Sequence, residues 1–383
     1  MTSGHLSEKN GYFYAVLSYT DAQGKRKTKW IATGLPAKGN KKKAEEILAI
    51  ERMAFVPPER IKDNADILFA DYMEQWLEIV KSSITVVTYS SYSTMVKGTI
   101  VPYFREKGIK LKDLTAKDIQ DFYLEKLKHV KANSVIHYHA NIHKALKYAV
   151  KLDMISVNPA DKVERPRKEP FIGSFYDADE MKTLLEACKG TKLEIPIMLA
   201  AFYGLRRSEA LGLKWDAVDF DRNTITIKHT VTECSVDGKV ILVKQDRTKT
   251  KSSMRTLPLV SAVKERLLEL KVEQEENRRL CGKSYIKEYA GYICVNEIGD
   301  LIKPGYVTNC FGKLLTETGL RKIRFHDLRH SCASLLLSSG VPMKQIQEWL
   351  GHSDFSTTAN IYSHLEYSSK LSSAHALSES LGL

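Results

Sequence analysis

The stretch NPADKVERPRKEPF, residues 158–171, carries three prolines among alternating charges. Proline has no backbone N–H and disfavours the helical conformation in the residue before it, so this stretch can be neither a continuous helix nor a central strand. It predicts an extended linker. A chain of 383 residues is also too long for one ordinary core. We therefore expect separate domains on the two sides of residues 158–171.

The chain before this linker begins with a strand-forming pattern. In GYFYAVLSYTDAQGKRKTKWIATGL, aromatic and branched side chains alternate on either side of a DAQGK turn, which predicts a β-hairpin or a three-stranded meander. Asn40 can cap the helix that follows, and the prolines at 57 and 58 end it. Residues 1–60 are therefore expected to form a small α+β unit.

This N-terminal unit has a cluster of basic residues at its predicted turn, namely Lys25, Arg26, Lys27 and Lys29. A charged hairpin is most often simply solvated. Aromatic strands beside a basic turn also fit a small sheet that enters a DNA groove. On that second interpretation the four basic residues contact DNA.

Residues 65–157 show helical periodicity in four segments, one of them opened by the capping pattern TAKD. We expect a small all-α bundle. His137, His139 and His143 lie on its last helix, but no carboxylate or cysteine completes a metal-ligand set beside them. We interpret these histidines as partly buried or DNA-facing polar residues.

Residues 172–383 mix helices with strands, and the runs TITIKHT and KVILVKQ are expected to pair. Asp177 and Glu180 have the spacing of a helix N-cap and its capping partner. The expected fold class is thus multidomain, with a small α+β N-terminal domain, an all-α bundle and a mixed, mainly α C-terminal domain that includes a small β-sheet.

Charge and composition limit the kinds of partner that we expect the chain to bind. The chain has 58 Lys and Arg against 46 acids, a formal charge of +12, which favours a polyanion such as nucleic acid or an anionic membrane surface. No run of 18 apolar residues and no secretory signal is present, so we expect a cytosolic protein. The six cysteines form no CxxC pair, which favours buried, reduced thiols.

The motif HDLRH, residues 326–330, admits three interpretations. Its histidines lie four apart on one helix face, as in zinc proteases, with Asp327 where those enzymes carry a glutamate. Arg329 on the same side would repel a metal dication, and its guanidinium suits an anion such as phosphate better. Polar residues bonded to backbone at a helix start are the third interpretation.

A second segment, AFYGLRRSEALGLKW, places arginines between two apolar helices. Gly204 is expected to end the first helix and Ser208 to cap the second, which leaves Arg206 and Arg207 in the turn. Glu209 can orient Arg206, but two arginines and one acid leave positive charge for an external anion. An internal salt bridge is the equal alternative.

Two further segments carry reactive side chains. DRTKTKSSMRTLPL holds Lys249 and Lys251 in a polar turn between two strand-like runs. In EWLGHSDFSTTANIYSHL, the glycine before His352 ends one helix, and Tyr362 lies about two turns into the next, which Ser356 can cap.

GLRRSE, TKTKSSMRTLPL, HDLRH, LGHSD and TTANIYSHL, in this order, resemble the five signature segments of the tyrosine recombinases, most closely the integrases of phages and conjugative transposons. The family's Lys-Thr pairing favours Lys249 over Lys251. The resemblance implies an active site, supported by Glu209, that consists of Arg206, Lys249, His326, Arg329, His352 and the nucleophile Tyr362.

The resemblance implies a recombinase that forms a covalent 3′-phosphotyrosine and integrates or excises a mobile element. Two arginines can grip the non-bridging phosphate oxygens, His326 can take the proton from Tyr362, and His352 can donate to a phosphate oxygen. Lys249 can protonate the leaving 5′ oxygen. We expect no metal or other cofactor, because these segments offer too few carboxylates to hold magnesium.

The domain plan also resembles that of these integrases, with an arm-binding domain at 1–60, a core-binding domain at 65–157 and a catalytic domain at 172–383. The expected partners are double-stranded DNA at core-type and arm-type sites, a homotetramer on DNA in which residues 366–383 pack onto a neighbouring subunit, and an excisionase or DNA-bending protein, but no membrane. A type IB topoisomerase-like relaxase and a catalytically silent DNA-binding regulator are the alternatives.

Overall fold

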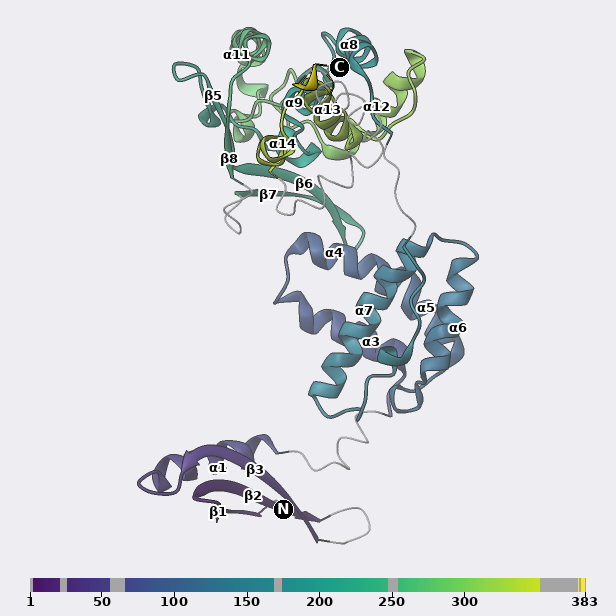
Figure 1. Ribbon diagram of the computed structural model, residues 1–383, viewed down its shortest axis with the longest axis vertical. Helices are drawn as coiled ribbons and strands as arrows, with labels where there is room; N and C mark the ends of the chain where they lie inside the picture. Colours follow the sequence, from purple (N-terminus) through teal and green to yellow (C-terminus); the bar gives the residue numbers. More distant parts are fainter. Residues whose placement is uncertain are drawn as a thin grey trace. The chain divides into compact units, whose positions relative to one another are not determined.

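A computed structural model of the chain describes residues 3–20, 26–55, 66–168, 174–246, 254–351, 378 and 380–382. The chain forms two compact units, residues 1–169 and 170–383, whose boundary falls inside the proline-containing segment (Figure 1). Helices predominate beside small sheets, which confirms the predicted fold class. In the described ranges no helix is long and apolar enough to cross a membrane.

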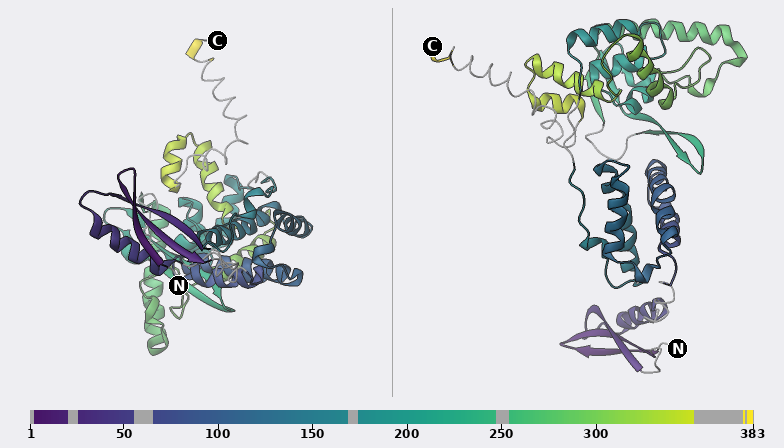
Figure 2. Two further views of the ribbon diagram at one scale, coloured as in Figure 1. Left: turned by 90° about the horizontal axis from the view of Figure 1, so that it is seen from below. Right: turned by 90° about the vertical axis from the view of Figure 1, so that its right-hand side faces the viewer.

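The N-terminal sheet has three antiparallel strands in the order β1-β2-β3, with helix α1 packed on it (Figure 2). The elements are β1 (Ser3–Lys9), β2 (Tyr12–Thr20), β3 (Arg26–Pro36) and α1 (Lys41–Ala54). The sequence analysis missed β1, which turns into β2 through Asn10 and Gly11, both at positive φ as a tight hairpin turn requires. Asn40 holds the N-cap position of α1, but its amide donates backward to the carbonyls of Pro36 and Lys38 and not to the helix.

In the helical part of the first unit, aromatic side chains from several helices pack against one another. Its helices are α3 (Phe69–Lys81), α4 (Val86–Met95), α5 (Val101–Lys107), α6 (Ala116–Leu127) and α7 (Ala132–Lys151). A π-helical turn, Val96–Ile100, joins α4 to α5 beside Pro102, whose missing N–H cannot continue the normal ladder. The predicted capping box of α6 is confirmed, since Thr115 and Asp118 bond each other's backbone N–H groups.

The start of the predicted linker is not extended. Pro159–Lys162 forms a 3-10 turn whose first free N–H bonds to the side chain of Asn158. His143 Nε2 lies 2.8 Å from Asp161, and this contact ties the turn to α7. A capping asparagine and a local hydrogen bond therefore outweigh the proline pattern here.

The second unit packs its main apolar core between helices and short strands, and a smaller apolar cluster lies between the helices that carry Cys332 and Ile346. The helices of this unit are α8 (Ala178–Ala187), α9 (Glu194–Tyr203), α10 (Arg207–Gly212), α11 (Ser261–Cys281), α12 (Pro304–Glu317), α13 (Asp327–Ser338) and α14 (Met343–Leu350). The predicted capping box of Asp177 and Glu180 at the start of α8 is confirmed. The six cysteines all lie among the described residues and form no disulfide, and Cys188, Cys294 and Cys332 are the buried ones.

The predicted pairing of TITIKHT with KVILVKQ is confirmed only for the end of the first run, because His229 and Thr230 begin the strand that pairs with KVILVKQ. The strands of this unit are β4 (Val218–Asp219), β5 (Thr224–Ile227), β6 (His229–Val236), β7 (Lys239–Asp246) and β8 (Arg255–Pro258). KVILVKQ in β7 pairs with β6, whereas TITI in β5 pairs with β4 and β8. The strands that flank residues 247–253 thus belong to two different sheets.

Candidate active site

The turn between α9 and α10 is set by a glycine. Gly204 follows α9 at φ +60°, and a Cβ there would lie 2.3 Å from Leu350 Cδ2, so a side chain would clash as well as strain the backbone. The predicted cap, Ser208, is wrong. Arg206 is the N-cap of α10, because the carboxylate of Glu209 reaches back to accept from the Arg206 backbone N–H at 3.1 Å.

Glu209 is fully buried and binds two guanidinium groups. Its Oε1 lies 2.8 Å from Arg206 Nη1, and its Oε2 lies 3.1 Å from Arg255 Nη2. Arg255 also donates from Nε to the carbonyl of Trp349 at 2.9 Å. Arg207, which was predicted to lie in the turn, is the first residue of α10 and donates to the hydroxyl of Thr308.

Arg329 lies beside this pair with only 1% of its surface exposed. Its Nη1 donates to the carbonyl of Gly204 at 2.7 Å, and its Nη2 donates to that of Leu350 at 2.6 Å. Burial, followed by the nearby charge of Arg206, lowers the pKa of Arg329 to about 9. The guanidinium therefore remains charged at neutral pH.

Three guanidinium groups and one carboxylate leave this part of the fold strongly positive. The predicted internal salt bridge between Arg206 and Glu209 exists, but the same carboxylate is shared with Arg255. The Arg206 side chain is the one that reaches solvent, with 34% of its surface exposed. The arrangement favours an external anion bound at Arg206.

His326 lies immediately before α13 and faces the same positive charge. Burial, then His330, Arg329 and Arg206 in turn, lower its pKa to about 4, although part of its surface remains accessible to water. The ring is thus neutral at pH 7 and can accept a proton. The His330 ring lies edge-on, 5.4 Å away, and its pKa is also lowered, chiefly by burial.

Asp327 is engaged by an arginine of its own turn. Arg324 donates to it from Nε at 3.0 Å, from Nη2 at 2.7 Å and from the backbone N–H at 2.8 Å. Burial opposes ionisation of this carboxyl, but the Arg324 bonds outweigh it and lower the pKa. Among the described residues no group of three or more His, Cys, Asp or Glu is placed to hold a metal ion.

The remaining predicted residues of the site, Lys249, His352 and Tyr362, lie outside the described residues. The strand before the segment that carries Lys249 ends at Asp246, whose Oδ1 lies 2.5 Å from His229 Nδ1. The other nitrogen of this buried histidine lies 2.9 Å from the hydroxyl of Tyr292.

The predicted DNA-contacting residues divide between two faces of the N-terminal sheet; Lys25 lies outside the described residues. Side chains alternate along β3, so Arg26 points to one face and Lys27 and Lys29 to the other. The Lys29 ammonium lies 5.6 Å from the centre of the Phe55 ring, which follows α1. Arg26 therefore lies on the face away from that ring.

Sequence reasoning missed Arg255 and His229. Arg255 lies inside the quoted run TKTKSSMRTLPL, and a lone arginine at a strand start was the available signal. His229 offered no signal, because its partners Asp246 and Tyr292 are distant in sequence. Both are recognised only when the β6-β7 and β5-β8 pairings are known.

Comparisons with known proteins match this chain along most of its length. Residues 174–369 match the phage integrase family, and residues 68–128 match the phage integrase N-terminal SAM-like domain. The tyrosine recombinase XerC-like protein of Caldanaerobacter subterraneus is 30% identical over 335 residues, which cover 83% of this chain and 84% of that protein.

Two solved structures share the fold at lower identity. The Tn1549 transposon integrase in complex with a circular intermediate DNA is 19% identical with a TM-score of 0.63, over 80% of this chain and 99% of that one. The lambda integrase tetramer bound to a Holliday junction is 20% identical with a TM-score of 0.56, over 93% of this chain and 94% of that one.

Proposed function

The chain belongs to the phage integrase family of tyrosine recombinases and is a site-specific DNA recombinase, and from this premise we propose that Arg206, Arg329 and His326 surround the phosphate that it cleaves. The observation that carries the proposal is the excess of buried positive charge around Glu209, which opens to solvent at Arg206. Attack on a phosphodiester builds negative charge on the non-bridging oxygens, and fixed guanidinium donors stabilise that charge.

The chemistry proceeds by transfer to tyrosine. The Tyr362 oxygen attacks the phosphorus, His326 accepts the phenolic proton, and the bond to the 5′ oxygen breaks. Lys249 donates the proton that this oxygen gains, and His352 donates to a phosphate oxygen. The resulting 3′-phosphotyrosine keeps the energy of the phosphodiester, so the 5′ hydroxyl of another strand can attack it and rejoin the DNA.

The partners follow from the same proposal. The protein binds double-stranded DNA at core-type sites through residues 65–157 and at separate arm-type sites through residues 1–60. It works as a homotetramer, with an excisionase or DNA-bending protein to set direction, during integration or excision of a mobile element. The lambda integrase tetramer bound to a Holliday junction supports the tetramer, and the Tn1549 integrase in complex with a circular intermediate DNA supports action on the DNA of a mobile element.

A covalent adduct tests the proposal. Wild-type protein incubated with labelled core-site DNA that carries a nick beside the cleavage point should give a protein-DNA band on a denaturing gel. Tyr362→Phe should bind the same DNA and give no band, because only the phenolic oxygen is lost. A band that persists in Tyr362→Phe would move the nucleophile elsewhere, Tyr367 being the nearest other tyrosine.

A sulfur substitution tests the role of the lysine. Lys249→Ala should slow cleavage by about 10² to 10⁴, the usual contribution of a general acid. A thiolate leaves without prior protonation, so a substrate with sulfur at the bridging 5′ position should restore most of the rate. Arg206→Ala should not be restored, because its partners are the non-bridging oxygens. Recovery of Lys251→Ala instead of Lys249→Ala would assign the acid to Lys251.

A further inference from the structure

One buried side chain, Arg255, connects three of the segments that carry the proposed site. It opens β8, directly after the segment that holds Lys249. Its Nη2 binds the Glu209 carboxylate at 3.1 Å, and Glu209 in turn holds Arg206 at 2.8 Å. Its Nε donates to the carbonyl of Trp349, three residues before His352.

The chain passes close over this guanidinium. Gly351 follows α14 at φ +68°, and a Cβ there would lie 3.0 Å from Arg255 Nη1. The Arg255 side chain is only 7% exposed, so it does not reach a substrate through bulk solvent. Its donors are directed at the supports of the site, the carboxylate behind Arg206 and the end of α14.

We propose that Arg255 is a positioning residue that holds the Arg206–Glu209 pair and the end of α14 in a fixed mutual arrangement, so that Arg206 keeps its position at the phosphate. This inference rests on the proposed function. Only a planar guanidinium holds several N–H groups in fixed directions, so that one can donate to a carboxylate while another donates to a carbonyl. A lysine can keep the charge opposite Glu209 but cannot hold both partners in that geometry.

The proposal predicts that Arg255→Lys lowers single-turnover cleavage at saturating DNA by about 10², since displacement of a reacting group by about 1 Å has that effect. Affinity for core-site DNA should change by less than about threefold, because only 7% of the Arg255 side chain is exposed. Methylguanidinium added to Arg255→Ala should restore cleavage in a saturable way, since it can refill the same space. A purely structural role would not produce that rescue.

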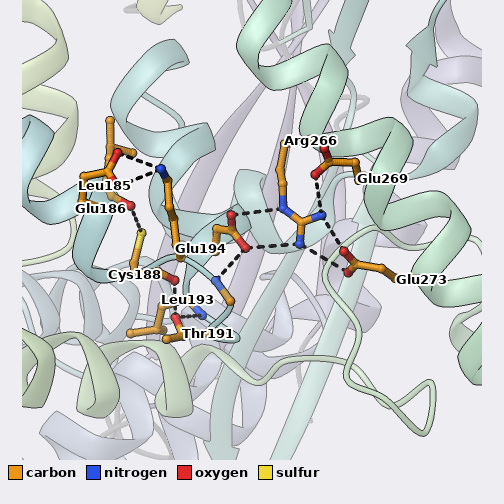
Figure 3. Close-up of polar contacts among 11 residues, drawn as sticks. Leu185, Glu186, Cys188, Thr191, Leu193, Glu194, Arg266, Glu269 and Glu273 are labelled. Atoms are coloured by element: carbon orange, nitrogen blue, oxygen red, sulfur yellow. Dashed lines mark hydrogen bonds and ion pairs between the residues drawn. The ribbon is translucent and has the colours of Figure 1, made fainter.

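Arg266 is the matched control. Figure 3 shows it between Glu194 and Glu273, with Nε 3.1 Å from Glu194 and Nη1 2.8 Å from Glu273. It is an arginine held by carboxylates in the same unit, at the opposite end of α9 from Gly204. Arg266→Lys should lower the melting temperature yet cleave at the wild-type rate per folded molecule.

The results separate the possibilities. Loss of cleavage in Arg255→Lys but not in Arg266→Lys, at equal DNA occupancy, supports the proposal. Wild-type cleavage by Arg255→Lys, or losses that follow the unfolded fraction equally in both variants, would overturn it. The wild-type protein run in parallel tests the proposed function separately, because absence of any adduct there would refute the recombinase chemistry and not the role of Arg255.

Discussion

Neutralising Glu209 should make the second unit depend on an added anion. Glu209→Gln keeps the shape of the side chain but removes the charge that Arg206 and Arg255 share. With Arg329 nearby, three guanidinium groups then lie together without a carboxylate between them. We expect lower stability and a stronger response to any dianion that can take the place of a DNA phosphate.

The magnitude follows from burial. Removing one partner of a buried ion pair costs about 3 to 5 kcal/mol, because the other charge remains without compensation. For a unit of this size each kcal/mol lowers the melting temperature by about 2 to 4 °C, which gives a loss of about 6 to 20 °C. An anion present at a concentration of about 100 times its dissociation constant should stabilise the folded state by about 2.7 kcal/mol.

Thermal unfolding in sulfate and in chloride of equal ionic strength measures this response. Glu194→Gln is the control, because Glu194 is also buried and bound to an arginine, Arg266, away from the site. Sulfate stabilises proteins in general because it is excluded from their surface. That effect should raise the melting temperatures of the wild type and both variants alike. The prediction is wrong if sulfate raises the melting temperature of Glu209→Gln no more than that of Glu194→Gln.

Three other outcomes follow from the structure. Burial, followed by His143 and Arg165, lowers the pKa of His139 to about 4 against an opposing effect of Asp161, so the folded state disfavours its protonation and stability falls as pH drops below about 6.5. Urea unfolding should show a loss of about 2 kcal/mol from this group between pH 7 and pH 5, absent in His139→Gln and retained in the exposed control His137→Gln. Arg26→Ala should weaken binding to arm-type DNA and reduce its salt slope by about one, with a smaller effect for Lys29→Ala; equal effects would refute the assignment of faces. EDTA should leave cleavage unchanged, because Glu209 and Asp327, the acids near the site among the described residues, are bound by arginines; recovery on adding magnesium after a loss would contradict this.

Local features of the fold were predictable because their determinants lie within a few residues. The capping boxes at Thr115 and Asp177 and the helix ends at Gly204 and Gly351 appear where the sequence places them. Each depends on one side chain or one positive φ. The hairpin turn at Asn10 and Gly11 was equally local, but the predicted sheet began only at Gly11 and so left out the strand before it.

Features that depend on distant partners were predicted less well. Ser208 is a good cap by residue type, but the fold places Glu209 where it can close a capping box on Arg206. The alternating runs in β5 and β7 show that strands exist but do not say which strands pair. The choice of pairing places Arg255 against Glu209, and a sequence pattern carries no information on that contact.

The burial of Arg329 depends in part on backbone carbonyls, which the numbers of acidic and basic residues in the sequence do not reveal. Its guanidinium binds the carbonyls of Gly204 and Leu350, at the C-terminal ends of α9 and α14. The last carbonyls of a helix have no partner within it and lie at the negative end of its dipole, so two helix ends stabilise the buried cation. A carboxylate partner would cancel the charge, whereas these neutral carbonyls leave it intact. These two carbonyls therefore offset part of the cost of burying Arg329 without adding a negative charge, and in the proposed site the guanidinium acts on the phosphate.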